Sequence, residues 1–267
     1  MSSGRGTTTR VPRPFGGITV QSASTLERIV AGAKSSWHLA LRAANRPTVL
    51  RDEYIDWLIL ANAGMQHPGN VYLFDLAMRS APSAPMLEIG SFCGLSTNIV
   101  QYLKRKHGRR ELLYTCDKWI FEGSENQLPD AAPVSQADVR EFVMESFQRS
   151  VRQFSPAGEL PAAIEATSDE FFDKWASHET VTDVFGQTRS LGGSLGFCFI
   201  DGNHSEEYAQ RDYEHCDQYL VPGGLILFDD SNDESDWDVK RVIRRIKRDG
   251  RYAVVAKNPN YLVRKER

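Results

Sequence analysis

Three aspartates at the ends of two short apolar segments are the residues of this chain best suited to chemistry. Asp201 follows residues 197–200, and Asp229 and Asp230 follow residues 224–228. Segments of this length, rich in β-branched and aromatic residues, predict buried strands of a parallel sheet. Ligands of open α/β sheets bind outside the carboxyl ends of the strands, so neighbouring strands would bring the three carboxylates together. Such a cluster resists full ionisation, and we expect a divalent cation or protonation to resolve it.

The chemistry of these side chains predicts a metal-assisted site. All-oxygen ligation by Asp201, Asp229 and Asp230 suits Mg2+, with Mn2+ or Ca2+ as alternatives, and is a poor match for zinc. His204 lies three residues after Asp201, and an imidazole is well suited to accept a proton near neutral pH. We therefore predict His204 and Asp201 as catalytic residues, with His204 as general base. Acids at a solvated sheet edge, and a histidine that caps the following helix, are the competing interpretations.

A glycine-containing turn predicts a second ligand beside the first. It follows a predicted strand at residues 86–89 and precedes a predicted helix at 96–106, and its glycines would let the backbone approach a ligand closely. The spacing differs from the dinucleotide fingerprint, and the carboxylate of Glu88 favours a ligand that carries an ammonium or sulfonium group. An ordinary strand-to-helix turn is the alternative. The predicted ligand contacts in and after this turn are Glu88, Gly90, Ser91, Phe92, Gly94 and Ser96.

Two further positions extend this ligand site. Asp117 ends the next predicted strand, 117 − 94 = 23 residues beyond Gly94, and an acid there can accept hydrogen bonds from ribose hydroxyls. Ser168 and Asp169 follow the third strand and are predicted to reach an adenine edge. A surface aspartate, and an N-cap for the helix at 170–175, are the respective alternatives.

Composition excludes several classes of protein. The 267 residues are 41% hydrophobic and carry a formal net charge of −3, which argues against a nucleic-acid partner. We expect neither a membrane span nor a signal peptide, because no apolar stretch is long enough. The four scattered cysteines predict reduced thiols. The expected location is the cytoplasm.

The order of predicted elements indicates an α/β fold. Strands alternating with helices predict a doubly wound, mostly parallel, seven-stranded Rossmann-like sheet with a C-terminal antiparallel hairpin and an N-terminal helical cap. We divide the chain into a flexible arm at 1–22, a helical cap at 23–80 and a ligand-binding domain at 81–267. The predicted strands lie at 86–89, 112–116, 163–166, 196–200, 224–228, 252–256 and 261–264. Segments 119–156 and 180–194 exceed ordinary loop lengths; a helix is predicted at 137–154, and the second segment would be a flap.

These motifs together resemble class I S-adenosylmethionine-dependent methyltransferases. Glu88-Ile89-Gly90-Ser91-x-x-Gly94, Asp117, Asp201-Gly202-Asn203-His204 and Asp229-Asp230 carry the resemblance. More narrowly, the chain resembles the metal-dependent macrocin O-methyltransferase and cephalosporin hydroxylase group over residues 60–267. Some relatives use an Asp as the catalytic base at the position of Asn203, whereas others carry a His at the position of His204.

The resemblance implies transfer of a methyl group from S-adenosylmethionine to a hydroxyl of a small molecule. It implies Mg2+ assistance, a sugar or other natural-product diol as acceptor, and a role in natural-product biosynthesis. The alternative is a non-methylating relative that binds S-adenosylmethionine, such as a hydroxylase component or a regulatory binding protein. The sequence leaves the acceptor and the oligomeric state open, with a homo-oligomer among the alternatives.

Overall fold

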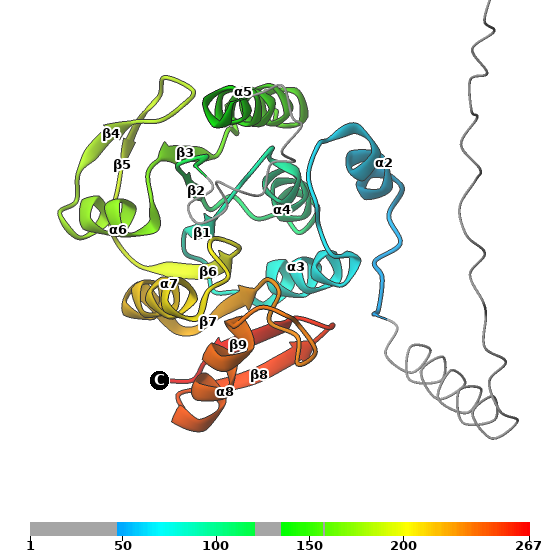
Figure 1. The fold of residues 1–267 in the computed structure, drawn as a ribbon, viewed down its shortest axis with the longest axis vertical. Coiled ribbons are helices and arrows are strands. Elements are labelled where there is room, and N and C mark those ends of the chain that lie inside the picture. The colour runs from blue at the N-terminus through cyan, green and yellow to red at the C-terminus, as the bar shows by residue number, and fades with distance from the viewer. Residues whose placement is uncertain (1–46, 121–134, 157) are drawn as a thin grey trace, which may run out of the picture. The chain divides into compact units, whose positions relative to one another are not determined.

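The structure is a computed structural model that describes residues 47–120, 135–156 and 158–267 (Figure 1). The predicted arm at 1–22 and residues 23–46 of the predicted helical cap lie outside the described residues, as does most of the first half of the predicted insertion at 119–156. Residues Pro47–Arg267 form one compact unit. The predicted domain boundaries stay predictions.

The described residues contain helices and strands in the order that the sequence predicts from residue 86 onward. The helices are α2 (Glu53–Ala61), α3 (Pro68–Ser80), α4 (Leu95–Lys106), α5 (Gln136–Phe154), α6 (Ser168–Ala176), α7 (Glu206–Tyr219) and α8 (Val239–Asp249). The strands are β1 (Met86–Ile89), β2 (Leu113–Asp117), β3 (Ala162–Glu165), β4 (Thr180–Thr182), β5 (Thr188–Ser190), β6 (Leu195–Ile200), β7 (Leu220–Phe228), β8 (Tyr252–Lys257) and β9 (Tyr261–Lys265). Among the described residues, no helix is long and apolar enough to cross a membrane.

Seven of the strands form one sheet in the order β3-β2-β1-β6-β7-β9-β8. The first five pair in parallel, and β9 runs antiparallel to both β7 and β8. The predicted fold class, a doubly wound Rossmann-like sheet that ends in an antiparallel hairpin, is confirmed.

Helices cover both faces of the sheet, and β6 shows why. All six of its residues are buried, and alternate side chains point to opposite faces. Phe197 and Phe199 join an apolar cluster with α2, α3 and α4, where the ring of Phe74 meets Phe199 edge to face at 4.8 Å. Cys198 and Ile200 join a second cluster with α6, α7 and α8. The described part of the predicted helical cap thus shares a core with the sheet.

Two segments differ from the sequence-based expectation. β7 begins at Leu220, whereas the sequence predicted a strand from residue 224. Leu195 pairs with Leu220 and Phe197 pairs with Leu225, so the intervening residues of β7 bulge out of register. Gly223 accommodates this bulge with φ +81°. The predicted flap contains a second, two-stranded sheet, the β4–β5 hairpin.

The register of the central strands aligns their carboxyl ends. Ile89 pairs with Cys116 on one side and with Ile200 on the other, and Ile200 pairs with Phe228. The residues that follow these four lie along one edge of the sheet. The strand order reverses between β1 and β6, which is the crevice where open α/β sheets bind ligands. Gly90, Asp117, Asp201 and Asp229 therefore meet at the expected binding edge.

The ends of β1 and β6 approach each other closely at Gly90, where a side chain would not fit. Its φ is +83°, and a Cβ placed on it would lie 2.1 Å from the carbonyl oxygen of Asp201. Gly90→Ala should therefore lower the free energy of unfolding by more than the cost of backbone strain alone, which is about 1–2 kcal/mol. Gly108→Ala is the control, because Gly108 has φ +69° with nothing within 4 Å. Urea unfolding of both variants measures the difference; equal losses would contradict the close approach.

Candidate active site

Two of the three predicted acids meet at the carboxyl edge of the sheet. Asp201, His204 and Asp229 each offer a ligand atom, and these atoms all lie within 4.8 Å of one another. Backbone hydrogen bonds hold the two acids level: the N–H of Asp201 donates to Ile89, and the N–H of Asp229 donates to Ile200. Asp201 after β6, His204 in the following loop and Asp229 after β7 therefore form one compact acid group.

The third acid lies on the far side of the histidine. Nε2 of His204 is 3.3 Å from a carboxylate oxygen of Asp201, and Nδ1 is 3.0 Å from one of Asp230. Asp230 adopts φ +46°, a left-handed conformation uncommon outside glycine. This conformation belongs to the turn after β7. The predicted role of Asp230 as a metal ligand stays a prediction.

Burial and close contacts between charged side chains shift the pKa values of this group. Burial, and then the neighbouring Asp229, raise the pKa of Asp201 well above its ordinary value. Burial lowers the pKa of His204, but hydrogen bonds to Asp201 and Asp230 outweigh it and bring that pKa to about 10. An imidazolium cannot accept a proton, so a base role for His204 requires that a cation offset the charge of the carboxylates.

The donor set fits a divalent cation. Within residues 47–120, 135–156 and 158–267, no lysine or arginine forms an ion pair with Asp201, Asp229 or Asp230. Carboxylate oxygens are the ligands that Mg2+ and Mn2+ prefer, so Asp201 and Asp229 fit such an ion. Among the described residues, His204 alone pairs with these carboxylates as a possible cation. A divalent cation at Asp201 and Asp229 would neutralise the remaining negative charge.

Two asparagines that the sequence analysis did not single out contact Asp229. Its Oδ1 accepts hydrogen bonds from the side-chain amides of Asn70, at the start of α3, and Asn260, at the turn before β9. No sequence signal separates these asparagines from ordinary helix-start and turn residues.

Asp117 organises the glycine turn. One carboxylate oxygen accepts the backbone N–H groups of Ser91 and Phe92, each at 2.9 Å, and the other accepts that of Trp119. The indole N–H of Trp119 in turn donates to the carbonyl of Phe92. The sequence placed Asp117 at this ligand site; its structural role, to hold the turn, and the contribution of Trp119 were not anticipated.

Glu88 lies buried beneath the same turn. Its Oε2 accepts a hydrogen bond from Thr97 at 2.5 Å, and among the described residues no hydrogen bond reaches Oε1. Burial raises the pKa of Glu88 to about 7, against the opposing effect of the Ser96 and Thr97 hydroxyls. A buried carboxylate with an unused oxygen can accept a donor or cation from a ligand. Gly94, with φ +90°, ends the turn and begins α4.

The residues after β3 have protein partners. Thr167, rather than Ser168 or Asp169, is the N-cap of α6, because its side chain accepts the N–H of Glu170. The capping alternative for the Ser168–Asp169 pair is therefore wrong. The carboxylate of Asp169 lies 2.9 Å from Nε2 of His215.

A buried acid on α7 stands near this corner. Asp212 has an oxygen 3.2 Å from where a Cβ on Gly202 would lie. Burial raises the pKa of Asp212 to about 6, opposed by the hydroxyl of Ser168. No sequence signal separates Asp212 from the other acids of an amphipathic helix.

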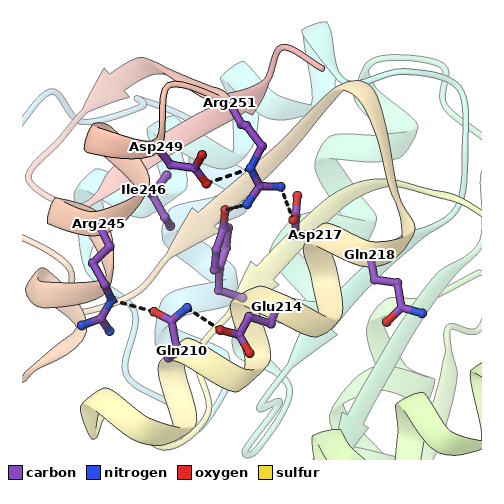
Figure 2. Close-up of a pocket in the computed structure, with 9 residues that line it drawn as sticks. Gln210, Glu214, Asp217, Gln218, Arg245, Ile246, Asp249 and Arg251 are labelled. Carbon is purple, nitrogen blue, oxygen red and sulfur yellow. Dashed lines mark hydrogen bonds and ion pairs between the residues drawn. The ribbon is translucent and has the colours of Figure 1, made fainter.

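A pocket between α7 and α8 is separate from these residues (Figure 2). No predicted site residue lines it. The guanidinium of Arg251 contacts Asp217, Asp249 and the hydroxyl of Tyr213. Glu214 accepts a hydrogen bond from the side-chain amide of Gln210.

Comparison with solved structures supports the fold. The fold is similar to that of the O-methyltransferase NovP, at 15% sequence identity and a TM-score of 0.50, over 87% of this chain and 100% of that chain. It is also similar to the methyltransferase PaMTH1 of Podospora anserina, at 13% identity and a TM-score of 0.51, over 95% of this chain and 100% of that chain.

A family described as a methyltransferase domain matches residues 87–231, from β1 to the turn after β7. These residues include the glycine turn, Asp117 and the acid group. The match spans more than half of the sequence, and the chain therefore belongs to this family of S-adenosylmethionine-dependent methyltransferases.

Proposed function

We propose that this methyltransferase transfers a methyl group to a hydroxyl of a small molecule with the help of Mg2+. One observation carries the proposal: the strand register places Asp201 and Asp229 on the same sheet edge as the glycine turn. Methyl transfer to oxygen needs a donor and a deprotonated acceptor side by side, and correct alignment alone can supply several kcal/mol. The narrower resemblance to the macrocin O-methyltransferase group belongs to this proposal.

The donor side is assigned to the turn after β1. S-adenosylmethionine supplies an electrophilic methyl group when bound. Glu88 would bind its cationic end. Gly90 and Gly94 give the turn its positive φ angles of +83° and +90°, and the backbone of the turn would lie against the ligand. Asp117 holds the turn through its hydrogen bonds to Ser91 and Phe92.

The acceptor side is assigned to the acid group. A divalent cation supplies Lewis-acid chemistry that lowers the pKa of a hydroxyl. Asp201 and Asp229 would hold it, with Asp230 as the further predicted ligand. His204 would take the hydroxyl proton, and the position of its imidazole next to Asp201 supports this role.

The acceptor is a diol in this proposal, because adjacent hydroxyls can chelate one cation. Trp237 supports an acceptor that also has an apolar surface. Its ring meets that of His204 edge to face at 5.3 Å, and the residue is 47% exposed. A half-exposed indole beside the acids gives the acceptor a flat apolar wall.

The metal role predicts that removal of one acid abolishes turnover without loss of the donor site. Asp201→Ala should reduce the rate at least about 100-fold, as removal of a metal ligand does, while S-adenosylhomocysteine binds with nearly unchanged affinity. Asp173→Asn, on the exposed face of α6, is the control. A methyl-transfer assay and calorimetry measure the two effects; full activity in excess chelator would reject the metal role.

The base role predicts a pH-dependent defect. His204→Ala should lower the rate at pH 7 by about 10²–10⁴-fold, the usual contribution of a general base. The rate should recover at higher pH, where hydroxide replaces the imidazole. His107→Ala is matched, because His107 also contacts a carboxylate, that of Asp75, but outside the site. A pH–rate profile that His204→Ala leaves unchanged would remove the residue as base.

The raised pKa of Glu88 predicts a pH-dependent stability. An acid whose pKa is raised in the folded state stabilises the protein below its ordinary pKa of 4.5, and this stability is lost as the pH rises through about 7. The loss is about 3 kcal/mol. Glu88→Gln should therefore stabilise the ligand-free protein at pH 8 and not at pH 4.5, as measured by denaturant unfolding.

The same variant tests the donor site. Glu88→Gln should bind S-adenosylhomocysteine more weakly, because the product keeps the ammonium group that the carboxylate would contact. The exposed Glu207→Gln should change neither stability nor affinity. Donor affinity of Glu88→Gln equal to that of the unsubstituted chain would contradict the assignment.

A further inference from the structure

The carboxylate of Asp229 is held by two buried amides from opposite ends of the described chain. The side-chain Nδ2 of Asn70 donates to Oδ1 of Asp229, and Nδ2 of Asn260 donates to the same oxygen at 2.9 Å. Asn70 is fully buried and Asn260 is 2% exposed. Burial of an amide is costly unless its polar atoms are paired, so both side chains are confined to orientations that satisfy these bonds.

The orientation of the Asn260 side-chain amide is fixed by its hydrogen-bond partners. Its Oδ1 accepts the backbone N–H groups of Ser231 and Asn232. A rotated amide would place N–H groups against these donors, so the NH2 group must face Asp229 and Asn70. Nδ2 of Asn260 also donates to Oδ1 of Asn70 at 3.0 Å. Because this contact uses the oxygen of the Asn70 amide, the NH2 group of Asn70 faces Asp229. The two amides form one connected unit.

The start of α3 is fixed against the β8–β9 turn, which sets the position of Asn70. A Cβ on Gly69 would lie 1.8 Å from the carbonyl oxygen of Asn258. The side chain of Asn258 donates to the carbonyl of Gly69 and pairs with the backbone of Thr48 in both directions. The amide unit is therefore attached to rigid backbone at both ends.

Uncharged amides suit the carboxylate of Asp229, because a metal-ligating carboxylate must keep its negative charge. A lysine or arginine at this position would orient Asp229 but would also supply the positive charge that the acid group otherwise draws from a cation. Two amides saturate Oδ1 and leave Oδ2 without a partner from either asparagine. Hydrogen bonds to a ligating carboxylate commonly orient it and contribute to metal affinity.

We propose that Asn70 and Asn260 are positioning residues, which fix Asp229 so that its second carboxylate oxygen faces a divalent cation. The inference rests on the proposed function, since it assigns the cation to Asp229. It adds that helix α3 and the C-terminal hairpin both contribute to cation affinity without touching the cation.

The test is Mn2+ binding to the full-length protein, followed by electron paramagnetic resonance. Asn70→Leu removes the amide, and Asn70→Ser removes it with a residue well tolerated in a first helical turn. Both should weaken Mn2+ binding about 10–100-fold, as loss of such partners does elsewhere. Affinity for S-adenosylhomocysteine should stay within about twofold of the unsubstituted chain, which also verifies that each variant folds.

A buried amide outside the site provides the control. Gln101 on α4 is 4% exposed, donates to the carbonyl of Glu159 and accepts from Lys104. Gln101→Leu should lower stability and leave Mn2+ affinity unchanged. Methyl-transfer activity of Asn70→Leu should recover at high Mg2+ concentration, which a general structural defect would not produce.

Two negative results have different meanings. If Asn70→Leu and Asn70→Ser bind Mn2+ as tightly as the unsubstituted chain, the positioning role is overturned and the proposed function stands. If the unsubstituted chain binds no Mn2+, or Asp201→Ala binds it equally well, the metal role in the proposed function is itself overturned.

Discussion

Two carboxylates that the sheet register holds at the same level, with no lysine or arginine paired to them among the described residues, are the constraint on which this structure depends. Asp201 and Asp229 each follow a strand whose last residue pairs with that of its neighbour, so backbone pairing fixes their spacing. Burial, and then repulsion from Asp229, raise the pKa of Asp201. Charges that cannot separate must be neutralised by protons or by a bound ion. The sheet thus creates a binding demand through the same hydrogen bonds that stabilise the fold.

The donor turn and the acid group are coupled by direct backbone contact. The space that Gly90 leaves is occupied by the carbonyl of Asp201, so β1 and β6 bring their two loops together at the switch point of the sheet. Asp117 adds a second link by binding the backbone of the turn. Movement of either loop would therefore disturb the other, and the relative placement of donor and acceptor belongs to the central sheet.

The site also contains buried acids whose ionisation is unfavourable. Glu88 and Asp212 are buried acids whose pKa values rise to about 7 and about 6. Buried acids destabilise a fold when they ionise, and perturbed pKa values cluster where proteins bind ligands. Both acids flank the carboxyl ends of the strands, whereas the ion pairs between α7 and α8 are mutually compensated. Among the described residues, the fully buried acids without an ion pair, Glu88 and Asp212, thus lie near one edge of the sheet.

Local pattern determined the strands, the helices after residue 86, the turn after β1 and the acids at the strand ends, because hydrophobic period and glycine placement are properties of short segments. It also led to the fold class, which was confirmed. Tertiary structure alone decided that Asp229, Asn70 and Asn260 share hydrogen bonds, since Asn70 and Asn260 are 190 residues apart. It also decided that Asp230 turns toward His204, and that Asp117 is occupied by the turn. Side-chain partners depend on which distant backbones meet, and no local pattern contains that information.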